Sequence, residues 1–218
     1  PLSQWGSHLD RCRDMGFSHL LLAPSFHPGA GGNIFLFSDF EKPHPALERN
    51  APAPSVVREI AEECAGRGLT LWLDLVMDRV AAGSGVVRDN PRWFAAEPSD
   101  PLPDPRQAFP RNRSSAFRFD EDTAPAITAW WTDRIGAWIA AGIGGFRVAR
   151  PQLLPPAFLH RVIEAGKSAN SDCRFVGWTP GLLPADLAEL RQTGLDFPVA
   201  STCWPLGTEQ VWLDAALS

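Results

Sequence analysis

The feature that most constrains the fold is a short apolar run, opened by two glycines and closed by a proline, Gly144-Gly145-Phe146-Arg147-Val148-Ala149-Arg150-Pro151. A helical pattern precedes it at 125–141 and another follows at 156–169, which is typical of a buried parallel strand between two helices. Side chains alternate along a strand, so Arg147 and Ala149 are expected on the same face. Burying an arginine in such a strand is unfavourable in free energy unless its side chain contacts an anion or a polar cleft. We therefore predict a polar site at the end of this strand.

The rest of the chain repeats the alternation of helix and strand. Further helices are predicted at 3–15, 54–67, 184–193 and 208–217, and further strands at 18–23, 69–77, 173–178 and 195–200. Residues 25–53 are expected to form a loop, and residues 78–124 a long, proline-rich connection of the kind that carries function or a small subdomain. This order predicts an α/β fold with a parallel sheet. Five strands are too few to close a barrel of eight.

Composition narrows the class of protein. The chain has 218 residues, 44% of them hydrophobic, and a net charge of −5, which argues against a nucleic-acid or anionic-membrane partner. No apolar run reaches the roughly 18–20 residues of a membrane span, and no leader sequence precedes Trp5, so a cytoplasmic location is expected. The opening residues, without an initiator Met, suggest a piece of a longer chain.

The cysteines and histidines give no sign of a metal site. Cys12, Cys64, Cys173 and Cys203 are scattered and form no C-x-x-C pair, so buried free thiols are expected. No His/Asp/Glu cluster, phosphate-binding loop or dinucleotide fingerprint occurs. We therefore expect neither a metal nor a cofactor.

Gly145 to Val148 resembles the fourth-strand signature of the α-amylase family of glycoside hydrolases and transglycosylases. The longer run through Pro155 looks most like the maltosyltransferases that elongate α-glucans from maltose-1-phosphate. The resemblance implies that residues 1–218 form one incomplete (β/α)8 barrel domain, about strands 2 to 6, with an insertion at 78–124. In that family an aspartate nucleophile follows Arg-Val, whereas here the residue is Ala149. Alanine cannot attack an anomeric carbon, so the family's double displacement cannot run at this position.

The next strand lacks the second catalytic group. Phe175 to Pro180 resembles the fifth-strand motif of the family, in which the strand ends in the glutamate that acts as general acid. Trp178 or Gly177 occupies that place, and no glutamate occurs between Glu164 and Glu189. Because this chemistry needs two carboxylates with different pKa values, the resemblance predicts a degenerate site.

A third strand end carries Asp74, Asp78 and Arg79. The run from Asp74 to Arg79 resembles the first conserved region of the family, with Asp78 and Arg79 in place of an Asn-His pair. A buried aspartate needs a partner, and Arg147 is the natural one because both line the same pocket in the family. A pair that only organises the barrel and a pair that contacts a ligand both remain open.

The predicted loop at 25–53 adds further candidates. Pro24 to Pro28 resembles the family's Pro-x-x-His-Pro, which implies a sugar contact for His27. One alignment places Phe37 where the family has a tyrosine ahead of the aspartate that aligns with Asp39. A phenyl ring at that position can still stack on a sugar but offers no hydroxyl.

Three functional hypotheses remain. The first is a pseudoenzyme of α-glucan metabolism that binds a glucan or maltooligosaccharide, or assists another glucan enzyme. The second is an active enzyme in which Asp39, Asp78 or Asp196 supplies a displaced carboxylate. The third is a structural module that packs against the remainder of its chain, since an open barrel exposes sheet edges.

Overall fold

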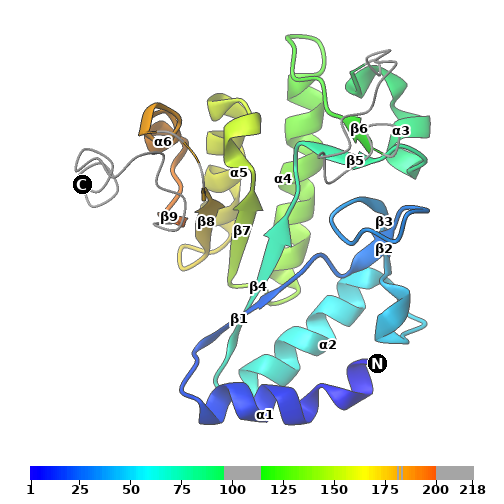
Figure 1. Ribbon diagram of the computed structural model, residues 1–218, viewed down its shortest axis with the longest axis vertical. Coiled ribbons are helices and arrows are strands. Elements are labelled where there is room, and N and C mark those ends of the chain that lie inside the picture. Colours follow the sequence, from blue (N-terminus) through cyan, green and yellow to red (C-terminus); the bar gives the residue numbers. More distant parts are fainter. Residues whose placement is uncertain (96–113, 181, 183, 200–218) are drawn as a thin grey trace.

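The computed structural model describes residues 1–95, 114–180, 182 and 184–199. Its centre is a parallel five-stranded sheet in the order β1-β4-β7-β8-β9 (Figure 1). The strands are β1 (His19–Leu22), β4 (Thr70–Leu75), β7 (Gly145–Ala149), β8 (Arg174–Trp178) and β9 (Phe197–Val199). The helices are α1 (Gly6–Asp14), α2 (Ala53–Ala65), α4 (Ala124–Ala140), α5 (Pro156–Ala169) and α6 (Pro184–Leu190). The strand order follows the chain order, as in a barrel wall, so the predicted partial barrel of α/β type is confirmed.

The two faces of the sheet differ in burial. Leu71, Leu73, Phe146, Val148 and Phe175 lie on the face toward the helices, and each is at most 1% exposed. The alternate positions form the other face, which the strands would turn inward in a barrel. That inner face is partly open: Trp178 is 44% exposed and Phe197 56%. Burial on the helix side therefore holds the sheet together, while the inner side remains available.

The predicted loop at 25–53 is wrong in part. It contains an antiparallel hairpin of β2 (Phe26–Pro28) and β3 (Phe37–Pro43). The hairpin forms because Phe26 and Phe40 pack against Trp138 on α4, at ring-centroid distances of 5.1 and 5.6 Å. Such contacts depend on a helix about 100 residues away, so the local sequence does not reveal them.

The connection at 78–124 also contains regular structure. A second hairpin joins β5 (Arg79–Ala81) to β6 (Ser114–Ala116), and α3 (Gly85–Asp89) follows β5. The strictly alternating α/β prediction therefore misses two small antiparallel sheets. The predicted helix at 208–217 and Cys203 lie outside the described residues.

The edges of the sheet are more open than the sequence suggests. The side chains of β1 alternate between exposed and half-buried, because among the described residues β4 is its one partner in the sheet. None of the helices in the described part of the chain combines the length and apolar character that crossing a membrane requires.

The two glycines that open β7 are required by close contact with β4. A β-carbon at Gly145 would lie 2.5 Å from the ring of Trp72, and one at Gly144 would overlap the side chain of Thr70 at 2.3 Å. The pairing of Trp72 with Gly145 sets the register of the two central strands. The glycine pair thus permits the alignment that places Asp74 opposite Arg147.

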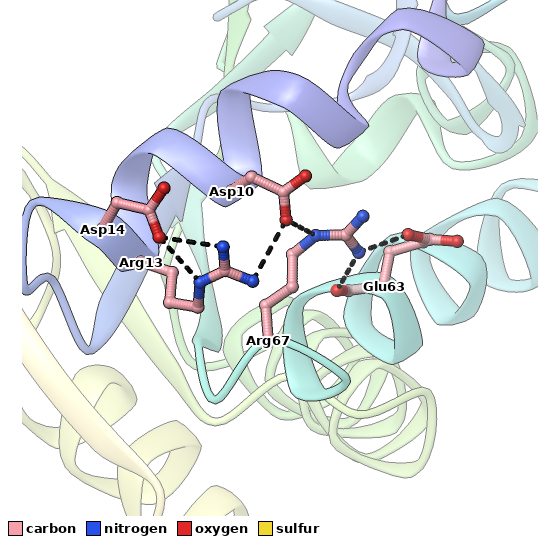
Figure 2. A network of polar contacts seen from close by, with 5 residues as sticks. All are labelled: Asp10, Arg13, Asp14, Glu63 and Arg67. Carbon is pink, nitrogen blue, oxygen red and sulfur yellow. Dashed lines mark hydrogen bonds and ion pairs between the residues drawn. The ribbon is translucent and has the colours of Figure 1, made fainter.

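A network of ion pairs connects α1 to the end of α2 (Figure 2). Arg67 donates from Nε to Asp10 at 2.9 Å and from Nη1 to Glu63 at 2.5 Å. Arg13 bonds to Asp10 at 3.3 Å and to Asp14 at 2.8 Å. These side chains are 21–65% exposed, so solvent and salt screen each pair. The network orients α1 more than it stabilises the fold.

Candidate ligand-binding site at the strand ends

The candidate site lies where β4, β7 and β8 end side by side. In the parallel register, Asp74 of β4 is opposite Arg147 of β7, and Ala149 of β7 is opposite Trp178 of β8. Asp78 lies between β4 and β5, three residues after β4 ends, and Arg150 follows directly after β7. Residues about 70 positions apart in the sequence therefore meet at the carboxyl ends of neighbouring strands. We call this end of the sheet, formed by Asp74, Asp78, Arg79, Arg147, Ala149, Arg150 and Trp178, the strand-end site.

Asp74 and Arg147 form the predicted ion pair. Arg147 donates from Nε to Oδ1 of Asp74 at 2.6 Å and from Nη2 to Oδ2 at 2.5 Å, which is a bidentate geometry. The carboxylate is buried, with a side chain 2% exposed, whereas the arginine side chain is 26% exposed. The pair therefore satisfies a buried charge and leaves the outer part of the guanidinium accessible.

Asp78 is held by two arginines. Arg79 donates from Nε to Oδ2 at 2.8 Å, and Arg150 donates from Nη2 to Oδ1 at 2.9 Å. Burial lowers the pKa of the Arg150 guanidinium, and the charge of Asp78 partly opposes this shift. Arg150 has the left-handed backbone conformation (φ 52°), which is uncommon for a residue other than glycine. Sequence reasoning missed Arg150, although its place directly after Ala149 was a usable signal.

The structure distinguishes the two candidates for the missing acid position. Trp178 is the register partner of Ala149 and therefore lies on the same face of the sheet. Gly177 is buried on the opposite face, where a β-carbon would lie 3.0 Å from Leu195. The indole of Trp178 is exposed, and the guanidinium carbon of Arg147 lies 4.7 Å from its ring centroid. An aromatic ring thus occupies the strand end on the side of the site.

The carboxylates of the strand-end site are engaged by arginines. Asp74 and Asp78 each bond to guanidinium groups at 2.9 Å or less. The arrangement provides hydrogen-bond donors and an aromatic face, which are means of binding a polar ligand.

The remaining predicted site residues do not join the strand ends. His27, Phe37 and Asp39 line a different cavity beside the β2–β3 hairpin, to which Asp74, Arg147 and Trp178 contribute nothing. Phe37 is 2% exposed and its ring centroid lies 3.7 Å from that of Phe40, so the open stacking surface expected of it is absent. The sequence order suggested one site because the hairpin was not foreseen.

The carboxylates proposed as displaced catalytic groups have other partners. Asp196 accepts a hydrogen bond from Lys167 at 2.9 Å and from the backbone N–H of Phe175 at 2.8 Å, at the start of β9 and β8 rather than at their ends. Asp39 pairs with Lys42 at 3.5 Å. The described residues include no group of three or more His, Cys, Asp or Glu side chains placed to hold a metal ion.

Comparison with known proteins agrees with this geometry. No family model matches the chain. It is 27% identical over 211 residues to an α-1,4-glucan:maltose-1-phosphate maltosyltransferase from Burkholderia pseudomallei, a match that covers 94% of this chain and 18% of that protein. Among solved structures, an α-amylase from Anoxybacillus is similar with a TM-score of 0.73 and 20% identity, over 91% of this chain and 44% of the enzyme. An α-amylase from Geobacillus thermoleovorans, complexed with acarbose, is similar with a TM-score of 0.71 and 20% identity, over 90% of this chain and 44% of the enzyme.

The fold and the site define a partial α/β barrel with its polar groups at the carboxyl ends of the strands. The chain is similar in sequence to part of a maltosyltransferase and in fold to part of the α-amylase barrel. It spans about a fifth of the length of the maltosyltransferase and under half of each amylase.

Proposed function

We propose that this α-amylase-like domain of glucan metabolism binds α-1,4-linked maltooligosaccharides at the strand-end site and does not cleave them. The observation that carries the proposal is the state of the two carboxylates: Asp74 and Asp78 are both bonded to arginines, and Ala149 lies between those pairs where the family has its nucleophile. The similarity to an α-1,4-glucan:maltose-1-phosphate maltosyltransferase supports the choice of sugar.

Binding would use the indole and the arginines together. A sugar ring has an apolar face that stacks on an aromatic ring, and Trp178 is 44% exposed at the site. Arg79 donates to Asp78 through Nε and Arg150 through Nη2, and each guanidinium carries further N–H groups that could bond to acceptors such as sugar hydroxyls. A few fixed donors beside an aromatic surface are typical of a specific small-molecule site.

The test is a tryptophan-fluorescence and calorimetric titration with maltohexaose, with cellohexaose as the control for linkage. We expect saturable binding of maltohexaose alone, and no phosphate release when maltose-1-phosphate is added. Trp178→Ala should weaken binding about tenfold, equivalent to about 1.4 kcal/mol. Phe17→Ala is the matched control, because Phe17 is also exposed but precedes β1 at the opposite end of the sheet. Equal affinity in both variants, or no binding by the folded protein, would refute the proposal.

Turnover in the same assay would favour the active-enzyme alternative. Asp39→Asn, Asp78→Asn and Asp196→Asn would then be compared, since a catalytic carboxylate contributes several orders of magnitude to the rate. We expect no such loss from Asp39 or Asp196, because neither lies at the strand-end site.

A second candidate function is packing against another part of a glucan enzyme, in the same chain or in a partner. Exposed apolar side chains at both edges of the sheet favour it: Phe17 and Leu21 beside β1, and Phe197 on β9. Open edges present unpaired backbone groups to further strands. We expect the isolated chain to bind the dye ANS and to self-associate in sedimentation analysis. A monodisperse monomer without ANS binding would contradict this function.

A further inference from the structure

A second cavity of about 440 Å³ lies beside the β2–β3 hairpin, between that hairpin, α3 and α4. These elements adjoin one another on the side of the molecule away from β8 and β9 (Figure 1). The volume is within the roughly 300–1,000 Å³ of sites that hold small molecules. Its lining includes His27, Asp39, Lys42, Asn90, Trp130 and Arg134.

Arg134 is the residue that most needs an additional partner. Its guanidinium carbon lies 3.6 Å from the ring centroid of Trp130 and 5.4 Å from that of Phe40. It donates one hydrogen bond, from Nη1 to the carbonyl of Trp130 at 3.1 Å, and its Nε is buried with no partner among the described residues. Burial lowers the pKa of this guanidinium, and the nearby charge of Glu41 opposes the shift. A planar set of donors is thus held rigidly on an aromatic ring with most of its hydrogen bonds unmade.

The opposite wall of the cavity supplies acceptors. Nδ1 of His27 lies 3.0 Å from the carbonyl oxygen of Pro28 and 3.2 Å from the hydroxyl of Ser38, and the tautomer with the hydrogen on Nδ1 satisfies the carbonyl. In the neutral imidazole Nε2 is then an acceptor. Asp39 forms a 3.5 Å ion pair with Lys42, whose side chain is 71% exposed, so carboxylate oxygens remain in reach of a ligand hydroxyl. Donors and acceptors therefore alternate around the cavity.

The formal charge of the lining is balanced. Three acids and three bases contribute to it: Asp39, Glu41, Asp89, Lys42, Arg88 and Arg134. A cavity without net charge gives no advantage to a strongly charged ligand, which would have to lose its hydration without compensation. A neutral molecule with many hydroxyl groups can use donors and acceptors of both kinds.

We propose that this cavity is a second saccharide-binding site, in which vicinal hydroxyls of a sugar accept hydrogen bonds from the guanidinium of Arg134 and donate to Asp39. The inference rests on the proposed function for its choice of an α-glucan. It adds a separate point of attachment outside the strand-end site, so one chain would hold a glucan at two places.

The test is isothermal titration calorimetry with maltotriose, which is short enough to occupy one site at a time. We expect two sites per chain in the unaltered protein. Arg134→Met keeps the aliphatic contact with Trp130 and removes the donors, so it should leave one site. Arg92→Met is the matched control, because Arg92 is an exposed arginine outside the cavity lining, and it should retain two. Trp178→Ala should retain the cavity site unchanged and weaken the strand-end site about tenfold.

The outcomes separate the two proposals. A stoichiometry and affinity unchanged by Arg134→Met would overturn the cavity site and leave the strand-end site standing. If Arg134→Met loses all binding and Trp178→Ala loses none, the strand-end site is overturned and the cavity site stands. If the unaltered protein does not bind maltotriose, both proposals are overturned. If Arg134→Met fails to fold, Asp39→Asn serves instead, because it replaces the proposed carboxylate acceptor on a side chain that is 34% exposed. It should weaken the second site at least threefold, and an unchanged affinity would overturn the inference.

Discussion

Removing either partner of the Asp74–Arg147 pair should destabilise the fold by different amounts. Deleting one member of a buried ion pair generally costs about 3–5 kcal/mol, because the other charge is left without compensation. Because the Asp74 side chain is 2% exposed, Arg147→Met leaves a buried charge unpaired and should lower the free energy of unfolding by about 3–5 kcal/mol. Arg147 is 26% exposed and keeps its contact with Trp178, so Asp74→Asn should cost only about 2–3 kcal/mol. In a chain of this length, that smaller loss lowers Tm by about 4–12 °C.

The assay is urea unfolding with calorimetry on the two single variants and the double variant. Asp14→Asn is the control, because Asp14 is 65% exposed in its pair with Arg13 and should change stability by less than about 0.5 kcal/mol. The double variant should be less destabilised than the sum of the singles, since the uncompensated charge disappears with its partner. Equal losses in the two single variants, the reverse order, or strict additivity would refute the burial argument.

The structure makes two further predictions. Gly145→Ala should lower the free energy of unfolding by about 1–3 kcal/mol in urea, because the added methyl would lie 2.5 Å from the Trp72 ring. Gly83→Ala should leave it unchanged, because nothing lies within 4 Å of that position. Equal effects of the two changes would contradict the close packing of β4 and β7. Burial raises the pKa of Cys64 and of Cys173 to about 11, so in a Cys12→Ser, Cys203→Ser background both thiols should resist DTNB at pH 8 until the chain unfolds. Fast labelling of the folded protein would contradict their burial. Because the unfolded thiols ionise near pH 8.5, unfolding releases protons above that pH, and stability should fall as the pH rises from about 9 to 11.

Part of the strand-end site could be predicted from residues alone. Asp74 lies inside an apolar strand, and a buried carboxylate needs a partner, so a pair with the arginine of another buried strand was foreseeable. The substitution at Ala149 was equally visible, because it follows a recognisable strand signature. Arg150 was not predicted, because its bond to Asp78 depends on a left-handed turn after β7.

The cavity beside the hairpin was beyond local reasoning. His27 and Asp39 were predicted as substrate-binding residues only through the resemblance of their loop to family motifs. In the structure they line a cavity with Trp130 and Arg134, which come from a helix about 100 residues later. Aromatic packing on α4 determines that placement, and no pattern within the hairpin sequence records it.

By itself, the sequence determined the parallel α/β architecture, the helix-covered strands and the absence of a carboxylate at Ala149. These follow from hydrophobic periodicity and residue chemistry, which are properties of neighbours along the chain. Only the tertiary structure decided that Trp178 rather than Gly177 faces the site, that two arginines share Asp78, and that β1 is an edge strand. Strand register and sheet order bring together residues 30 to 75 positions apart, and a one-residue change of register would turn each side chain to the other face.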